Sequence, residues 1–195
     1  MFQHKTSRRA TTLLLSAGLA VVTIVAALAA AGPTWTTLAP MPVATEGGQT
    51  GVIGNTIVVA YGYSSGDTNL TRLYDIDANS WSPGATAPGP KRSEGTAVTH
   101  GGNLYAIGGR PQGSVGNRID RYNLASDSWN STLASMPTAR AGLGSAVVGN
   151  AIYAIGGRTG FASAPCSGSP TNAVERYDGR PAIRVDVVAL HGLRW

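Results

Sequence analysis

The sequence predicts an all-β fold made of about three similar repeats, and three observations support this. The chain of 195 residues contains 26 Gly and 11 Pro with only 13% charged residues, a balance that favours short strands and turns over long salt-bridged helices. The segment Leu104–Arg110 returns almost unchanged as Ile152–Arg158. Trp35, Trp81 and Trp129 recur at nearly equal intervals, close to the spacing of those two segments. A fixed period of roughly 20 to 50 residues indicates stacked repeats that share a core.

The segment 1–31 is predicted to form an apolar helix that is not part of the repeats. Lys5, Arg8 and Arg9 precede Leu13–Ala31, an unbroken run with no charged side chain. A basic start, an apolar run and small residues at its end are typical of a secretory signal peptide. This run also just reaches the length of a bilayer span, so an N-terminal membrane anchor is the alternative. Under either interpretation, the repeats are predicted to be extracytoplasmic.

The middle repeat shows the predicted order of strands. Small and β-branched residues at Gly95–Thr99 suit an inner strand that packs closely against other backbones. Gly101–Asn103 supplies a tight turn, and the apolar segment Leu104–Ile107 suits a strand that is buried on both faces. Arg118–Tyr122 alternates polar and apolar residues, as a strand with one solvated face does. After a polar turn, Trp129 is predicted to open the fourth strand.

Glycines, tyrosines and tryptophans mark the same points in successive repeats. A Gly-Gly pair ends the second strand by permitting conformations that a Cβ would block. A Tyr follows in the third strand, and a Trp comes at a fixed spacing after it, as from Tyr74 to Trp81. The positions predicted to be structural in this way are Gly108, Gly109, Gly156, Gly157, Tyr122, Tyr177, Trp81 and Trp129.

This order of Gly-Gly, Tyr and Trp, repeated at the interval that separates Trp81 from Trp129, resembles the kelch repeat. The resemblance covers Trp35 to Asp178, about three quarters of the chain. It implies a partial kelch-type β-propeller, in which each repeat forms one four-stranded blade around a central channel. The predicted organisation is a signal peptide or anchor at 1–31, propeller blades in an incomplete ring at 32–178, and an aberrant C-terminal tail at 179–195.

The first repeat is the poorest match to the pattern. The segment Tyr61–Tyr63, which is Tyr-Gly-Tyr, stands where the other repeats have Ile-Gly-Gly, and Tyr63 is therefore predicted to take the place of the second glycine. Glu46 is predicted to stand at the position that Arg92 and Arg140 occupy in the later repeats.

The third repeat is predicted to be incomplete. The pattern requires a Trp near position 184, where the sequence has Arg184, and residues 179–195 match no part of the repeat. We interpret this tail as the product of a truncated or frame-shifted reading of a longer gene. Closure of a propeller ring takes roughly four to eight blades. An arc of three would expose the apolar faces of its end blades, so self-association with another copy of the chain is one predicted way to cover them.

Charge and residue composition argue against several classes of function. The formal net charge is +5, but basic and acidic residues balance within 32–178, so nucleic-acid binding is not expected. The histidines are His4, His100 and His191, and the single cysteine is Cys166. A Ser-His-Asp triad or a multi-histidine metal site cannot be assembled convincingly from these residues. We therefore predict no metal and no other cofactor, and assign no catalytic residue.

Four arginines are the candidate ligand-binding residues, because they recur at the ends of the two central strands. Arg92 and Arg140 precede the inner strand, whereas Arg110 and Arg158 follow the Gly-Gly pair. In kelch-like propellers, loops at these points can line the channel mouth, which implies that the arginines could bind carboxylates in bidentate fashion. The alternative is a structural role between blades. Their partners would then be backbone carbonyls or the acidic residues Glu94, Asp120 and Glu175.

The predicted function is that of an exported kelch-repeat binding module for a protein or carbohydrate ligand, as a fragment of a larger propeller. The alternative is a carbohydrate-active propeller enzyme, because sialic-acid mutarotases share the fold that the resemblance implies, and the arginines could then orient an acidic sugar. Contact with a membrane is predicted only if the N-terminal segment is not cleaved.

Overall fold

The computed structural model describes residues 34–160 and 168–179. The chain divides into two units, Met1–Leu38 and Ala39–Trp195, and the sheets described below lie in the second unit. All regular elements of the described residues are β-strands, as predicted. Among these residues there is no helix whose length and apolar character would let it cross a bilayer. The predicted signal or anchor at 1–31, and all of the tail but its first residue, lie outside the described residues.

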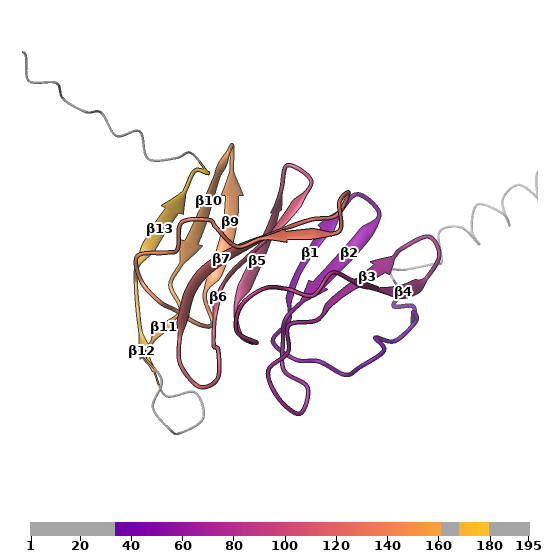
Figure 1. The fold of residues 1–195 in the computed structure, drawn as a ribbon, viewed down its shortest axis with the longest axis horizontal. Helices are drawn as coiled ribbons and strands as arrows, with labels where there is room; N and C mark the ends of the chain where they lie inside the picture. The colour runs from indigo at the N-terminus through magenta and orange to yellow at the C-terminus, as the bar shows by residue number, and fades with distance from the viewer. Residues whose placement is uncertain (1–33, 161–167, 180–195) are drawn as a thin grey trace, which may run out of the picture. The chain divides into compact units, whose positions relative to one another are not determined.

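Two four-stranded antiparallel sheets form the first two blades (Figure 1). Within each blade the strands follow one another in sequence order, as consecutive hairpins require. Gly54 in the first blade and Gly101 in the second turn the chain between the first two strands, at φ values of 58° and 55°. The strands of these blades are β1 (Gln49–Ile53), β2 (Thr56–Ala60), β3 (Thr71–Asp75), β4 (Ser80–Gly84), β5 (Thr96–His100), β6 (Asn103–Gly109), β7 (Gly116–Asn123) and β8 (Ser128–Asn130).

The third blade has three strands among the described residues, in the order β13-β10-β9. They are β9 (Gly144–Val148), β10 (Ala151–Ile155) and β13 (Val174–Tyr177). A separate two-stranded ribbon, β11 (Arg158–Thr159) and β12 (Ser169–Pro170), lies in the long connection from β10 to β13. In the described part of the chain no strand plays the role of β4 and β8, so β13 is the outer edge of this sheet (Figure 1). The position at which the pattern requires the next tryptophan, 184, lies outside the described residues, so the incomplete third repeat stays a prediction.

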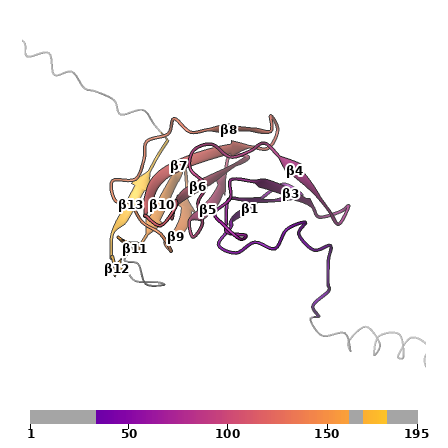
Figure 2. The same cartoon turned by 60° about the horizontal axis from the view of Figure 1, so that its bottom comes forward.

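The three blades stack through their inner strands, with β5 between β1 and β9 (Figures 1 and 2). Small side chains make this close approach possible. A Cβ on Gly51 of β1 would lie 2.6 Å from the side chains of Thr99 and Leu104, closer than any real side chain can approach. On the other side of β5, the hydroxyl groups of Thr96 and Ser145 lie 2.7 Å apart. The predicted inner strand of small residues is therefore β5.

Two apolar clusters fill the spaces between neighbouring blades. The cluster between the first and second blades consists of Val58, Ala60, Tyr61, Ala87, Leu104, Ala106 and Tyr122. The cluster between the second and third blades consists of Ile107, Ile119, Met136, Leu143, Ile152 and Ala154. Strand β6 contributes Leu104 and Ala106 to the first cluster and Ile107 to the second, because successive side chains of a strand point to opposite faces. This explains why its sequence is apolar without interruption.

The glycine pairs adopt backbone conformations that other residues rarely adopt. Gly108 and Gly109 have φ values of 59° and 106°, and a Cβ on Gly109 would lie 2.7 Å from a backbone carbonyl oxygen. In the first blade the same two conformations belong to Tyr61 at 58° and Gly62 at 110°. The prediction that Tyr63 replaces the second glycine is therefore wrong. Tyr61 replaces the first glycine, and the second glycine is retained.

The first repeat is also shifted by one position from its predicted alignment at the start of the inner strand. Glu46 forms an isolated β-bridge with Tyr63, which follows the Gly-Gly position. Ser93 forms the same bridge with Arg110 in the second repeat. Glu46 therefore corresponds to Ser93, and Thr45 takes the place predicted for Glu46, that of Arg92. The cause is the linker that follows the tryptophan, which is shorter by one position in the first repeat than in the other two.

A cluster that we call the Tyr-Trp clasp closes the second blade onto the linker before it. Tyr122 and Trp129 are paired across β7 and β8, with ring centroids 5.1 Å apart. The Tyr122 hydroxyl donates a hydrogen bond of 2.6 Å to Asp127, which also accepts the backbone N–H of Ala85 at 2.7 Å. The indole N–H of Trp129 donates to the Ala85 carbonyl at 3.0 Å. The fixed spacing between Tyr and Trp is what allows this arrangement.

The first blade has the same clasp with asparagine in place of aspartate. The Tyr74 hydroxyl donates to Asn79 Oδ1 at 2.6 Å, and the backbone N–H of Ala39 donates to the same atom at 2.8 Å. The indole N–H of Trp81 donates to the Ala39 carbonyl at 3.0 Å. Both complete blades therefore use their Tyr and Trp to hold the linker that precedes the blade.

Replacing Asp127 with alanine is expected to lower the free energy of unfolding by about 1 kcal/mol. The Tyr122 hydroxyl and the Ala85 amide lose their acceptor, and the loss is small because the Asp127 side chain is exposed. The hydrogen bond from Tyr122 holds the pKa of Asp127 below its usual range, so this contribution is present at neutral pH and is lost as the pH falls through that lowered value. Urea unfolding at several pH values measures both effects.

The matched control for this prediction is Asp127→Asn. Asn79 makes the equivalent bonds in the first blade, so the asparagine variant should stay within about 0.5 kcal/mol of the natural protein at neutral pH. It should also lack the loss of stability that titration of Asp127 causes. Equal losses for the alanine and asparagine variants would contradict the role given to the clasp.

Candidate functional site

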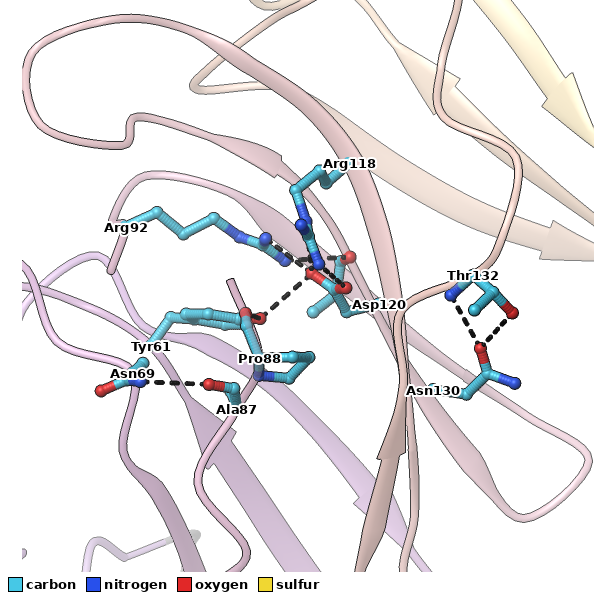
Figure 3. A network of polar contacts seen from close by, with 10 residues as sticks. Tyr61, Asn69, Ala87, Pro88, Arg92, Arg118, Asp120, Asn130 and Thr132 are labelled. Atoms are coloured by element: carbon cyan, nitrogen blue, oxygen red, sulfur yellow. Dashed lines mark hydrogen bonds and ion pairs between the residues drawn. The ribbon is translucent and has the colours of Figure 1, made fainter. Parts of the chain in front are cut away.

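Arg92 lies inside the protein, at the junction of the first and second blades (Figure 3). The side chain is 1% exposed, and its Nη1 donates to Asp120 Oδ2 at 2.7 Å. The guanidinium carbon lies 3.9 Å from the ring centroid of Tyr61, whose hydroxyl donates to the same carboxylate at 3.1 Å. Arg118 completes the group with a bond of 2.7 Å to Asp120 Oδ1. The buried carboxylate of Asp120 therefore holds two arginines and one tyrosine.

Burial and hydrogen bonding raise the pKa values of two side chains in this group. The Tyr61 hydroxyl has its pKa raised well above the usual range, chiefly because burial disfavours the phenolate. The pKa of Arg118 is raised by its hydrogen bond to Asp120. Both groups therefore keep one protonation state across the physiological range, and neither is suited to exchange protons with a ligand.

Arg140 has the same role between the second and third blades. The side chain is 0% exposed and donates through Nη2 to Glu175 Oε2 at 2.8 Å. Its Nη1 donates to the carbonyls of Gly156 and Ala173 at 3.0 and 2.8 Å. Glu175 precedes its tyrosine by two positions, as Asp120 does. Pairing of Arg92 with Asp120 and of Arg140 with Glu175 is what a structural role for the two arginines predicts. A ligand would have to displace these buried ion pairs to reach either arginine.

The first blade lacks this ion pair. Thr45 takes the place of Arg92, as described above, and Arg72 takes the place of Asp120, two positions before the tyrosine of the third strand. Arg72 is only 5% exposed, and its two Nη atoms have no hydrogen-bond partner. The arginine–carboxylate network is therefore a feature of the second and third blades, which explains why the first matches the repeat pattern poorly.

Arg110 and Arg158 lie together at a partly exposed site that also contains Glu94. These two arginines follow the glycine pairs of the second and third blades, and their side chains are 22% and 20% exposed. Arg110 Nε lies 3.2 Å from Glu94 Oε1, and Arg158 Nη2 forms an ion pair with Glu94 Oε2. We call these three residues the Arg-Glu-Arg cluster. It carries a formal charge of +1 where two blades meet.

Glu94 holds a backbone conformation that the other blades assign to glycine. A chain of backbone hydrogen bonds runs from the Glu94 amide to the Gly47 carbonyl (3.0 Å) and from the Gly142 amide to the Glu94 carbonyl (2.8 Å). Gly47, Glu94 and Gly142 therefore hold the same position in the three repeats. Their φ values are 59°, 56° and 61°, respectively. This left-handed region destabilises a residue with a Cβ by roughly 1–2 kcal/mol. The carboxylate is thus placed beside the two arginines at a cost in stability.

Polar contacts fix the backbone around the cluster. Asp67, from the loop between β2 and β3 of the first blade, accepts the Ser93 hydroxyl at 2.8 Å and the Gln112 amide at 3.0 Å. Ser93 adjoins Glu94, and Gln112 follows Arg110 by two positions. The loops that carry two of the three charged side chains are therefore tied to the first blade.

Comparison with known proteins agrees with this architecture. The family model described as "Kelch motif" matches residues 91–137 and 139–178. These residues are kelch repeats. The first match spans all four strands of the second blade, and the second match spans the described strands of the third. The predicted resemblance to the kelch-repeat family is confirmed.

One solved structure that is similar to this chain is that of YjhT. The two share 26% sequence identity with a TM-score of 0.57, over 63% of this chain and 37% of the YjhT chain. The chain therefore spans little more than a third of that structure. No match was found among curated proteins.

The structure separates the four predicted arginines into two pairs. Arg92 and Arg140 are buried, whereas Arg110 and Arg158 meet at one partly exposed site. The described residues contain no group of three or more His, Cys, Asp or Glu side chains that could hold a metal ion. Sequence reasoning named Glu94 only as a pairing partner. The signal that could have singled it out is a glutamate where both neighbouring repeats have glycine.

Replacing Glu94 with glycine is expected to raise the free energy of unfolding by about 1 kcal/mol. The substitution removes a left-handed strain of roughly 1–2 kcal/mol and gives up partly exposed ion pairs worth about 0–1 kcal/mol. Urea unfolding measures the change. Glu94→Gln is the control, because it removes the charge and keeps the strain, and should not be stabilising. A destabilised glycine variant would contradict this prediction, because the ion pairs of Glu94 would then outweigh the backbone strain.

Proposed function

We propose that this chain is an exported kelch-repeat binding module, and that its protein or carbohydrate ligand presents a carboxylate to Arg110 and Arg158. The observation that carries the proposal is the Arg-Glu-Arg cluster, in which equivalent arginines of adjacent kelch repeats converge on one glutamate. Export rests on the basic and apolar character of residues 1–31.

Side-chain chemistry supports an acidic ligand. Arg110 and Arg158 bring two guanidinium groups to one partly exposed place, where both contact the carboxylate of Glu94. Guanidinium and carboxylate groups match in shape and form paired, charge-assisted hydrogen bonds. An exposure of about a fifth leaves the two arginines reachable from solvent, while their surroundings partly shield the ion pair from water.

The conformation of Glu94 supports a functional role for the same cluster. Backbone strain that is retained at one repeat, where the neighbouring repeats avoid it with glycine, is often found at binding sites. A glutamate that pairs with two arginines also holds their side chains in one orientation before a ligand arrives, which reduces the entropy cost of binding.

Titration calorimetry with ligands that differ only in a carboxylate tests the proposal. Glucuronic acid is compared with glucose, and an aspartate-rich peptide with its asparagine counterpart, each added to the full chain. We expect saturable binding of an acidic member and none of its neutral partner. Combined Arg110→Ala and Arg158→Ala substitutions should weaken binding by roughly 10- to 100-fold, as expected for loss of a charged hydrogen-bonded pair.

Lys91→Ala is the matched control, because it removes one positive charge from an exposed side chain outside the cluster and should leave the affinity unchanged. If Lys91→Ala weakened binding equally, the loss of affinity in the arginine variant would be explained by overall charge rather than by the cluster. Failure of every acidic ligand to bind would contradict the proposal. Chemical conversion of an acidic sugar, followed by NMR, would favour the enzymatic alternative over a pure binding module.

A further inference from the structure

The outer edge of the third blade points to a partner strand. In the first two blades the outer strand places a tryptophan directly opposite the tyrosine of the third strand, as Trp81 opposite Tyr74 and Trp129 opposite Tyr122. Tyr177 holds the same place in β13, but among residues 34–160 and 168–179 no strand pairs with its outer side (Figure 1). An unpaired edge of this kind presents backbone donors and acceptors to an added strand.

A cavity of about 370 Å³ lies beside this edge. Its lining includes Ala134, Met136 and Tyr177. Ala134 corresponds to Ala85, the linker residue whose carbonyl accepts the indole of Trp129. The residues two positions further on make matching backbone hydrogen bonds. The Met136 amide donates to the Asn117 carbonyl at 2.8 Å, and the Ala87 amide donates to the Asn69 carbonyl at 2.9 Å. The cavity therefore occupies the place that the tryptophan side chain fills in the second blade.

The adjoining face of the third blade is also uncovered. Ile107 and Ile119 of the second blade are 1% and 3% exposed, because the third blade packs on them. The residues at the same positions of the third blade, Ile155 and Val174, are 44% and 62% exposed. An apolar face that is buried in one repeat and exposed in the next is the mark of a missing neighbour.

The chain itself contains a segment of the required pattern. Trp35 precedes Ala39 by four positions, as Trp81 precedes Ala85, and both alanines serve as the clasp acceptor of a blade. Trp35 lies in no strand and its side chain is fully exposed. Residues 34–38 therefore have the sequence of an outer strand, and the described residues contain no blade before them that this strand could complete.

We propose that residues 34–38 of a second copy of the chain add to the free edge of β13, with Trp35 opposite Tyr177 and its indole in the cavity. A second copy is favoured over the same chain because Ala39 is bonded to the first blade, through Trp81 and Asn79. The four positions back to Trp35 reach at most about 14 Å from there. The third blade lies two sheet spacings of about 10 Å each beyond the first.

Reciprocal exchange of this segment makes a closed assembly. Each copy gives one strand and receives one, so two copies related by a twofold axis satisfy both free edges. The three blades that the described residues form, taken from each copy, make six, which lies within the range of roughly four to eight blades that closes a propeller ring. This inference stands apart from the ligand site, because none of its residues belongs to the Arg-Glu-Arg cluster.

Sedimentation velocity of the full chain tests the proposal first. We expect a dimer whose dissociation constant rises by roughly 30-fold or more in Trp35→Ala, as for the central aromatic residue of an interface. Leu70→Ala, which removes another exposed apolar side chain, is the control and should leave the constant unchanged. A monomer at all concentrations would overturn the proposal, as would a dimer that Trp35→Ala does not weaken.

Disulfide trapping tests the register. The pairing of Arg121 with Asn130 in the second blade predicts that Arg176 of one copy pairs with Thr36 of the other. Chains with Arg176→Cys and chains with Thr36→Cys, both also carrying Cys166→Ser, are mixed and oxidised. We expect a covalent heterodimer, and much less of it with Thr37→Cys, whose side chain points to the opposite face. No excess of the Thr36→Cys product over the Thr37→Cys product would overturn the register.

Discussion

Replacing Asp120 with alanine is expected to lower the free energy of unfolding by about 3–5 kcal/mol, one of the two largest effects among the substitutions considered for this protein. Asp120 is the carboxylate shared by Arg92, Arg118 and Tyr61, and the side chains of Asp120 and Arg92 are 0% and 1% exposed. Without it, Arg92 becomes a buried cation with no opposite charge. Arg118 loses less, because its side chain is 36% exposed and remains solvated. Urea unfolding measures the loss.

The control is a double variant that removes both buried charges. Asp120→Leu combined with Arg92→Met keeps the apolar volume and leaves only the partly exposed Arg118 without its carboxylate, so it should recover most of the stability that Asp120→Ala loses. Ligand affinity, where a ligand has been found, should be unaffected in the double variant, since neither residue belongs to the Arg-Glu-Arg cluster. A cost below about 1 kcal/mol for Asp120→Ala would contradict the structural role of the network.

Replacing Gly108 with alanine is expected to cost about 2–5 kcal/mol in stability. Its φ of 59° destabilises a residue with a Cβ by roughly 1–2 kcal/mol, and overpacking adds about 1–3 kcal/mol. The overpacking arises because the new Cβ would lie 2.7 Å from the Arg140 carbonyl oxygen and 3.0 Å from Met136 Cε. These atoms belong to the segment that leads into the third blade, so the substitution tests the packing between two blades.

Gly156→Ala is the matched control. Gly156 occupies the same position of the third blade at a φ of 61°, but the nearest atom to its Cβ would be 3.6 Å away. It should therefore cost only the conformational part, roughly 1–2 kcal/mol. Thermal or urea unfolding of the two variants gives the comparison. Equal costs would mean either that the clash at Gly108 relaxes or that another blade packs against Gly156 in solution.

The fold could be predicted from the sequence because its signals are local and repeated. The apolar run at 104–107, the turn glycines and the Tyr-Trp spacing each depend on a short stretch of chain, and each appears at least twice. The same counting failed where the repeats differ in length. The linker before the first blade is shorter by one position, which misplaced Glu46 and Tyr63.

The candidate site could be predicted only in part. Recurrence identified four arginines, but it cannot distinguish a buried pair from an exposed one, because all four recur with the same period. What separates them is the position of the carboxylates. Asp120 and Glu175 lie on strands that face the preceding blade, whereas Glu94 lies in the turn before β5. Such contacts between blades depend on packing, which sequence spacing does not report.

Arginine side-chain NMR during titration with an acidic ligand tests most directly the division of the four arginines into a ligand-binding pair and a structural pair. The Nε–Hε signals are assigned with Arg→Lys variants and followed as glucuronic acid or the aspartate-rich peptide is added to the full chain. We predict saturable shifts for Arg110 and Arg158, with Arg92 and Arg140 unchanged because they stay in their buried ion pairs. Shifts centred on Arg92 and Arg140, with Arg110 and Arg158 unaffected, would contradict the account.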